Sequence, residues 1–370
     1  MTHLLILLDD IETPSRLIGA AVFAFVFVRA LAVESRYPPS AAGWMITRVG
    51  LMAALMLSLV AGLNYLVNPF GIYPSRLFEP IVLHSRMEKM HLYRTAQPPP
   101  EIVVLGSSSS FTMSPAYIRQ RTGRPAFNAS MHGGVPEDYL AFLRYMASID
   151  KVPKVLIVPL SVELVRPNLP TGFEPHNPLK PYLDRTSSRP LEELRWLFTL
   201  EQTRASFRLL ASEQRGRPPS HYRFDADGWA HFVESGATLD QIVDSYLTTK
   251  EWGRGLFAFE RLDETQMSYF RQFLELARRL GAEVIVYVPP LYPRAVALYD
   301  RETNLPSLRA KLIEHLHAWH GEGLVAAVHD FTRVESFGGR SAEFHDLAHP
   351  TADASRRMLD LLLGSLPARS

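Results

Sequence analysis

Short apolar runs alternate with segments of helical periodicity over residues 100–165 and again over residues 260–365. The runs are rich in β-branched residues, which is typical of strands buried on both faces. Strands of this kind that are separated by helices form parallel sheets with helices on each side. We therefore predict a three-layer α/β/α fold. Its expected strands cover residues 102–105, 126–129, 155–160, 283–288 and 324–328.

Helix signals fill the intervals between these strands. Ser114 and Pro115 are suited to the N-cap and the first position of a helix. Gly281 is suited to the position after the last turn of another helix. The expected helices cover residues 115–122, 136–149, 263–280, 305–320 and 352–363.

Residues 49–67 form an apolar run in which Ser58 and Asn64 are the only strongly polar members. The run is long enough to cross a hydrocarbon core of about 30 Å, and it lacks the polar face of a buried core helix. We expect a transmembrane helix here. A second stretch, residues 17–33, is interrupted by Arg29. It is a second span, an interfacial helix or an upstream extension outside the working protein.

Charges near these stretches predict the orientation. Acidic rather than basic residues precede the second stretch, which argues against a cleaved signal peptide. Arg29, Arg36 and Arg48 lie between the two stretches and are opposed only by Glu34. The positive-inside rule places this connection in the cytoplasm. We therefore expect an inner (cytoplasmic) membrane protein whose C-terminal domain faces the periplasm, whether there are one or two spans.

The chain is expected to have four parts. Residues 1–48 form an N-terminal region, residues 49–67 the transmembrane helix and residues 68–99 a membrane-proximal linker. Residues 100–370 form the α/β domain, in which residues 166–260 interrupt the alternation and are expected to be an insertion.

Two of these segments carry aromatic residues whose role is open. The basic and aromatic residues of 72–97 belong either to a linker with a helix packed on the domain, or to a contact with lipid headgroups or an anionic polymer. The insertion has an amphipathic helix near residues 191–210. Its Trp196, Trp229 and Trp252 either form a small core or stack on sugar rings.

Composition excludes several classes of protein. The formal net charge is +1, so no general basic field is available for nucleic acid. The chain has no cysteine, which excludes a disulfide framework and a thiolate metal site. We expect no cofactor and no metal.

Two motifs carry the candidate chemistry. The strand at 102–105 runs through Gly106 into a cluster of four serines, residues 107–110. A serine on such a strand-to-helix turn is exposed beside free N–H groups that can stabilise an oxyanion. Near the C-terminus, Asp346 and His349 are three residues apart on one predicted loop. Together these motifs supply a Ser–His–Asp set for acyl transfer.

The combination resembles the SGNH/GDSL hydrolase superfamily. The first block of that superfamily, Gly-Asp-Ser, falls on residues 106–108, so that Ser107 replaces the aspartate and Ser108 is the matching nucleophile. The last block, Asp-x-x-His, falls on Asp346 and His349. The resemblance implies a flavodoxin-like parallel sheet and an acyl-serine intermediate.

Two further blocks of the superfamily concern the oxyanion. Residues 127–134 resemble the second block, with Gly133 as the best match to its oxyanion glycine. The third block, Gly-x-Asn-Asp, is absent, and residues 158–163 stand in its place. The resemblance therefore implies that the N–H groups of Ser108 and Gly133 bind the oxyanion, with the Ser161 side chain as a candidate replacement for the asparagine.

The membrane anchor and the altered third block resemble the membrane-anchored branch of the superfamily, which modifies cell-surface polymers as the alginate O-acetylation proteins do. The resemblance implies an acyl-ester hydrolase or O-acetyltransferase that acts on a polysaccharide or other acylated carbohydrate. Its expected partners are membrane lipid around the helix and, for a transferase, a membrane-bound acyltransferase that delivers the acyl group. The alternative is a catalytically idle fold that binds a polysaccharide or assembles with such an acyltransferase.

Other sites compete with this interpretation. His345, Asp346 and His349 are residue types that bind zinc, but Pro350 disfavours the helix that would align the two histidines. Residues 225–228 mimic the start of a calcium loop without its closing glutamate, so a turn is the better interpretation. A phosphate-binding loop at Gly106 would need a lysine that is not there.

Overall fold

The computed structural model describes residues 41–70, 73, 75, 77–78, 85–167, 178–183, 194–214, 222–232, 238–249 and 260–366. These residues belong to two compact units. The smaller unit is drawn from Met1–Glu79 and Ser188–Arg215, and the larger from Pro80–Ser187 and Gly216–Ser370.

A parallel sheet forms the centre of the larger unit. Its strands are β1 (Ile102–Val104), β2 (Ala126–Asn128), β3 (Val155–Pro159), β6 (Glu283–Val288) and β7 (Ala327–Asp330). They are ordered β2-β1-β3-β6-β7, which is the flavodoxin-like order. Val104 lies opposite both Asn128 and Ile157, so the carboxyl ends of three neighbouring strands meet at one edge.

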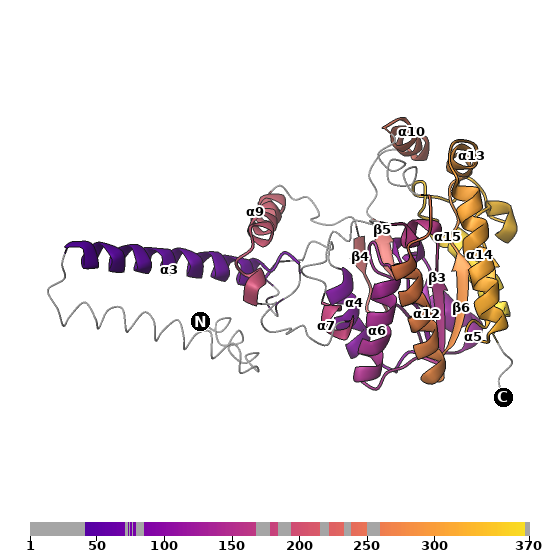
Figure 1. Cartoon of the computed structure of the whole chain (residues 1–370), viewed down its shortest axis with the longest axis horizontal. Helices are drawn as coiled ribbons and strands as arrows, with labels where there is room; N and C mark the ends of the chain where they lie inside the picture. Colours follow the sequence, from indigo (N-terminus) through magenta and orange to yellow (C-terminus); the bar gives the residue numbers. More distant parts are fainter. Residues whose placement is uncertain are drawn as a thin grey trace. The chain divides into compact units, whose positions relative to one another are not determined.

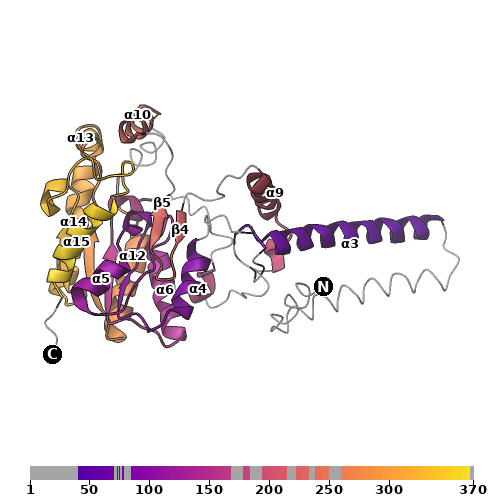
Figure 2. The ribbon, with the colours of Figure 1, turned by 180° about the vertical axis from the view of Figure 1, so that it is seen from behind.

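Helices flank this sheet. On one side lie α6 (Pro136–Ser148), α12 (Glu264–Arg279) and α14 (Leu305–Gly321). Figure 1 shows these three helices on one face of the sheet. Phe270 of α12 contacts Tyr139 of α6 and Trp319 of α14, with ring centroids 6.4 and 5.6 Å apart. On the other side lie α5 (Pro115–Thr122) and α15 (Ala352–Gly364) (Figure 2). The Tyr117 hydroxyl of α5 donates a 2.8 Å hydrogen bond to Asp360 of α15. The predicted α/β class, with a parallel sheet between helices, is confirmed.

The predicted helix ends are also confirmed. Ser114 caps α5, where its Oγ accepts a hydrogen bond from the Tyr117 N–H at 3.3 Å. Gly281 follows α12 with a φ of +75°, a conformation that glycine adopts without strain. Strand β7, by contrast, begins at Ala327 rather than at Leu324. The Leu324 N–H bonds to the Trp319 carbonyl and so completes the end of α14 instead of joining the sheet.

Several short elements add to those expected, and α4 among them is the helix that one of the two interpretations of residues 72–97 included. They are α4 (Ser85–Thr95), α7 (Lys180–Leu183), α10 (Leu239–Thr249), α13 (Pro293–Glu302), the strands β4 (Tyr222–Phe224) and β5 (Ala230–Phe232), and the 3-10 turns η1 (Ser108–Ser110), η2 (Val162–Val165) and η4 (Val334–Phe337). Strands β4 and β5 form an antiparallel hairpin whose turn contains Asp225 and Gly228, joined by a 2.8 Å hydrogen bond. The prediction of a turn rather than a calcium loop is confirmed for this segment.

The smaller unit contains two long helices, α3 (Ala41–Val67) and α9 (Leu200–Gln214). Within α3, Thr47–Val67 is long and apolar enough to cross a membrane, with a mean hydropathy of 1.9. The second apolar stretch, residues 17–33, lies outside the described residues. The helix expected near residues 191–210 begins as a continuous helix only at Leu200, and it belongs to the unit of α3.

Candidate active site

Ser108 begins the turn η1, four residues after the end of β1. The chain passes close to β3 here. A Cβ at Gly106 would overlap the ring of Pro159 and lie 2.7 Å from the Ser110 Oγ, so only glycine fits without a shift. The turn places Ser108 half-buried at the carboxyl edge of the sheet, where ligands bind in sheets of this order.

The four clustered serines have different partners. Ser107 and Ser109 share a hydrogen bond of 2.8 Å between their Oγ atoms. Ser110 Oγ lies 2.8 Å from the hydroxyl of Tyr287 on β6. Ser108 is the member whose Oγ contacts the C-terminal histidine, at 2.8 Å from His349 Nε2. The structure thus singles out the serine that the sequence had matched to the nucleophile.

A buried asparagine holds the serine turn in place. The Asn128 side chain, at the end of β2, donates hydrogen bonds to the carbonyls of Ser110 and Met113 at 2.8 and 2.9 Å. Its Oδ1 accepts from the Ser130 N–H at 2.9 Å. A fully buried amide with these partners fixes both the turn and the following loop, because leaving any of its groups unpaired would be costly.

The spacing of Asp346 and His349 follows from a local turn. Asp346 Oδ1 accepts hydrogen bonds from the Ala348 and His349 N–H groups at 2.9 and 3.0 Å, which is an Asx turn. The second carboxylate oxygen lies 2.7 Å from His349 Nδ1. The same carboxylate therefore shapes the loop and orients the imidazole ring.

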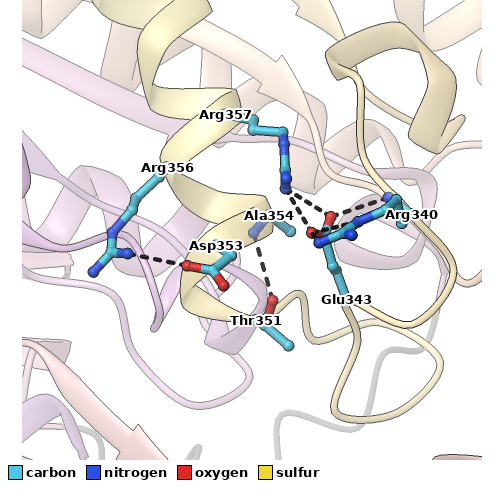
Figure 3. Close-up of polar contacts among 7 residues, drawn as sticks. All are labelled: Arg340, Glu343, Thr351, Asp353, Ala354, Arg356 and Arg357. Atoms are coloured by element: carbon cyan, nitrogen blue, oxygen red, sulfur yellow. Dashed lines mark hydrogen bonds and ion pairs between the residues drawn. The ribbon is translucent and has the colours of Figure 1, made fainter.

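This loop is closed at its base. His345 N–H bonds to the His349 carbonyl at 2.8 Å, and Thr351 N–H bonds to the Glu343 carbonyl at 2.9 Å. Thr351 also caps α15 through its hydroxyl, which accepts from the Ala354 N–H (Figure 3). The loop that carries the aspartate and the histidine is thus continuous with a regular helix.

Two arginines enclose Glu343 at the same base. The Glu343 carboxylate accepts from Arg340 Nε at 3.0 Å and from the Arg357 guanidinium at 2.7 and 2.8 Å (Figure 3). Burial opposes the charged form of Glu343, yet the two arginines hold its pKa below the usual value. The pair with Arg357 joins the loop to α15.

A threonine connects the loop that carries Ser108 with the loop that carries His349 through a hydrogen bond. Thr112 Oγ1 donates to the Pro350 carbonyl at 2.9 Å and lies 2.7 Å from Ser355 Oγ on α15. Both hydroxyls are buried. Thr112 lies shortly after Ser108 in the chain, and Pro350 directly follows His349. The contact between Thr112 and Pro350 therefore holds Ser108 and His349 close together.

The electrostatics of Asp346 favour its charged form. Burial alone would raise the pKa of Asp346. However, the neighbouring His349 ring and the two backbone N–H groups that donate hydrogen bonds to the carboxylate lower this pKa below its ordinary value. A carboxylate that stays ionised at neutral pH can hold the imidazole in one tautomer and stabilise its cation.

A cavity of about 220 Å³ opens beside Ser108 and His349. Gly133 and Ser161 also line it, so the structure brings four of the five predicted site residues to one cavity. Asp346, the fifth, lies behind His349. Apolar side chains complete the cavity wall, among them Val162, Leu164, Val288, Leu291 and Leu305.

The backbone N–H groups of Ser108 and Gly133 lie near the cavity and have no acceptor among the described residues. Gly133 has a φ of +57°, a left-handed conformation that turns the chain between β2 and α6. Ser161 lies at the end of β3, on the same edge of the sheet as Ser108. The three residues expected to bind an oxyanion thus line one cavity.

Sequence reasoning missed the support of the Gly133 loop. Arg86 of α4 is buried; its Nε donates to Asp138 Oδ1 at 2.8 Å, and its guanidinium also donates to the carbonyls of His132 and Gly133 at 3.2 and 3.3 Å. Ser85 Oγ accepts from the His132 N–H at 2.7 Å. In the sequence, Arg86 is one of several basic residues in 72–97, where a packed helix and a contact with lipid headgroups or an anionic polymer were both open, and no local pattern distinguishes it from the others.

The competing sites do not assemble. Within the part of the chain that the structure describes, no group of three His, Asp, Glu or Cys side chains has a metal-binding arrangement. His345 is hydrogen-bonded through its backbone to the base of the loop, and Asp346 uses both oxygens within the turn. The zinc alternative therefore lacks its ligand set here.

The tryptophans of the insertion have different environments. Trp196 is buried and contacts Phe70 with ring centroids 5.8 Å apart, so it belongs to the core of the smaller unit and is not an exposed platform for a sugar. Trp229 is half-buried against His231. Trp252 lies outside the described residues.

Comparisons with known proteins add little to this description. No protein-family model matches the chain, and no curated protein matches it. Among solved structures, it is similar to a candidate acylhydrolase from Bacteroides fragilis, at 12% sequence identity and a TM-score of 0.35. The alignment covers 76% of this chain and 92% of that one. At this TM-score the likeness carries no argument about activity, which rests on the residues of the chain itself.

Proposed function

We propose that this chain is a serine-dependent acyl-ester hydrolase or O-acyltransferase of the SGNH type. The observation that carries the proposal is the hydrogen-bonded series Ser108–His349–Asp346, with contacts of 2.8 and 2.7 Å, at the rim of a cavity. A nucleophile bonded to a base that is oriented by a carboxylate is the arrangement used for acyl transfer.

The first half-reaction forms an acyl-serine. Ser108 Oγ attacks the carbonyl carbon of an ester as His349 Nε2 takes the hydroxyl proton. Asp346 holds the ring through Nδ1 and offsets the charge of the imidazolium. The tetrahedral intermediate collapses, the bond to the leaving alcohol breaks, and the alcohol takes the proton from His349.

The negative charge that develops on the carbonyl oxygen needs donors in the cavity. The N–H groups of Ser108 and Gly133 and the hydroxyl of Ser161 are proposed to supply them. One such donor contributes about 3–4 kcal/mol of transition-state stabilisation in a serine hydrolase. A side-chain hydroxyl in place of the usual asparagine amide can still donate one hydrogen bond.

The second half-reaction decides between hydrolase and transferase. Water or a sugar hydroxyl attacks the carbonyl carbon of the acyl-serine, and His349 removes the proton from the attacking oxygen. His349 then returns this proton to Ser108 Oγ as the bond to the acyl group breaks and the new acid or ester leaves. A transferase outside the cytoplasm has no free acetyl-coenzyme A there, so it would receive the acyl group through a membrane-bound acyltransferase.

The acyl group is proposed to be short. A cavity of about 220 Å³ is smaller than the roughly 300–1,000 Å³ of clefts that hold drug-sized ligands. This size favours acetyl over long-chain esters. The resemblance to the membrane-anchored SGNH branch supports a polysaccharide as the acylated or accepting molecule, and the apolar helix α3 supports a membrane anchor. Arg29, Arg36 and Arg48 support placing the larger unit on the periplasmic side.

A catalytically idle fold is the competing proposal. An idle protein has no need to keep a serine, a histidine and an aspartate within hydrogen-bond distance of one another, which favours the enzyme. Hydrolysis of 4-nitrophenyl acetate by the full chain in detergent tests the two. Activity that Ser108→Ala removes and Ser109→Ala retains supports the enzyme. Equal, background-level hydrolysis by all three proteins contradicts it.

A further inference from the structure

In the smaller unit, a polar residue inside the apolar helix α3 is hydrogen-bonded to a neighbouring segment. Asn64 of α3 is fully buried. Its Nδ2 donates to the Leu197 carbonyl at 2.7 Å and to Thr203 Oγ1 at 2.9 Å, and its Oδ1 accepts from Ser206 Oγ at 2.9 Å. Three hydrogen bonds thus join α3 to the first half of α9 and to the turn before it.

The depth of this contact follows from the geometry of α3. Asn64 lies three residues before the end of the apolar span Thr47–Val67, or about 4–5 Å along the helix axis at 1.5 Å per residue. If the span crosses the hydrocarbon core, Asn64 lies just inside its outer boundary. The first turns of α9 then reach the same depth.

Helix α9 has a buried face and, opposite it, an exposed face with apolar side chains. Gln202, Ala205 and Leu209 are buried, whereas Leu200 and Phe207 are 62% and 60% exposed. Leu194 and Phe198, just before the helix, are also exposed. At 100° per residue, Leu200 and Phe207 lie within 20° of each other around the helix axis. The result is a narrow apolar stripe along the outer face.

Two arginines border that stripe. Arg204 and Arg208 are exposed and follow Leu200 by four and eight residues, so they lie on the flank of the same face. Apolar side chains beside arginines are typical of helices that lie in the headgroup region, where the guanidinium groups contact lipid phosphates.

We propose that α9 is an interfacial helix and that its occupant is the outer leaflet of the bilayer that α3 spans. Leu200 and Phe207 enter the boundary of the acyl chains, and Arg204 and Arg208 bind headgroup phosphates. Two observations select lipid over a protein partner: α9 is bonded to α3 at the depth of Asn64, and α3 itself exposes apolar side chains, among them Leu59 and Leu66. The inference rests on the proposed membrane anchoring.

The absence of cysteine from the chain allows a direct test. Single cysteines replace Phe207 or Leu200 in the full chain and carry a bimane fluorophore. The labelled protein is reconstituted into phosphatidylcholine vesicles with or without bromine on the acyl chains. Leu55→Cys, on exposed α3, is the membrane control, and Leu361→Cys, 42% exposed on α15, is the control outside the smaller unit.

Bromine in the lipid should quench the label at residue 55 most strongly, the labels at residues 200 and 207 less strongly, and the label at residue 361 not at all. If residues 200 and 207 behave like residue 361 while residue 55 is quenched, α9 is not interfacial and the inference is wrong. If residue 55 is also unquenched, membrane anchoring fails and the inference fails with it. Ester hydrolysis, measured on the unlabelled protein, reports the catalytic part of the proposed function separately.

Discussion

His349 Nε2 lies 2.8 Å from Ser108 Oγ although 241 positions separate the two residues in the chain. The contact joins the turn after β1 to the loop before α15. Parallel strands present their carboxyl ends at one edge of a sheet, and Thr112 bonds the two loops directly. The fold therefore assembles the proposed catalytic set from residues that no local pattern connects.

Asp346→Asn should preserve the fold and abolish most of the activity. An amide can hold His349 in the wrong tautomer and cannot offset an imidazolium charge, a change that costs about 10⁴-fold in kcat in a serine protease. Ester hydrolysis and circular dichroism check the two parts of this prediction. Asp353→Asn, at an exposed ion pair of α15, is the matched control and should be fully active. An active Asp346→Asn protein would argue against the proposed role of the carboxylate.

Arg86→Lys should weaken both the fold and the site. The guanidinium bonds to Asp138 and to the carbonyls of His132 and Gly133, and an ammonium cannot make all of these contacts. Breaking a buried ion pair outright costs about 3–5 kcal/mol, so a partial loss should lower the denaturation midpoint clearly. Because the Gly133 loop shifts, kcat should fall more than KM rises.

Arg94→Lys provides the comparison for Arg86, because Arg94 is exposed on the same helix α4. This variant should match the unmodified protein in urea denaturation and in ester hydrolysis. Equal behaviour of the two lysine variants would mean that Arg86 does not support the Gly133 loop.

Stability should fall as the pH decreases below about 6.5. Burial lowers the pKa of His329 and of His345, and the nearby His349 adds to the effect at His345. Unfolded histidines bind protons near pH 6.5, before the folded ones do, so protonation favours the unfolded state. Asp346, with its lowered pKa, adds a further loss at more acidic pH, as the pH falls through its folded pKa.

Urea denaturation at several pH values measures this effect. His329→Gln should flatten the pH dependence, because the amide does not titrate and can still reach Ser365, which lies 2.9 Å from His329 Nε2. A free energy of unfolding that is constant between about pH 7 and pH 5 would contradict the prediction.

The cavity predicts a preference for short acyl chains. An acetyl ester should be hydrolysed with a kcat/KM at least about tenfold higher than an octanoyl ester, since each unaccommodated methylene group costs about 1–3 kcal/mol. Leu291→Ala removes part of the cavity wall and should raise the relative activity on the longer ester. An octanoyl ester that is the better substrate of the unmodified protein would overturn the assignment of a short acyl group.

Much of the sheet and its helices follows from the sequence, because β-branched runs, Ser114, Pro115 and Gly281 act locally. Which of the four serines contacts the histidine follows only in part. The resemblance indicated Ser108, but the reason lies in distant partners such as Tyr287, which engages Ser110.

Other features depend entirely on tertiary contacts. Arg86 is one basic residue among several until Asp138 and two carbonyls surround it. Asn64 is an unexplained polar residue in an apolar run until α9 supplies its partners. Periodicity and turn residues carry no information about such contacts, since the groups involved are far apart in the chain.

Mass spectrometry after reaction with a fluorophosphonate tests the central claim most directly. The reagent phosphonylates a serine that a histidine activates, so the account predicts one adduct per chain, on the peptide that contains Ser108. The adduct should be lost in Ser108→Ala and nearly lost in His349→Ala, and it should persist in Ser107→Ala. No adduct on the folded protein, or an adduct that survives Ser108→Ala, would contradict the assignment of Ser108 as the nucleophile.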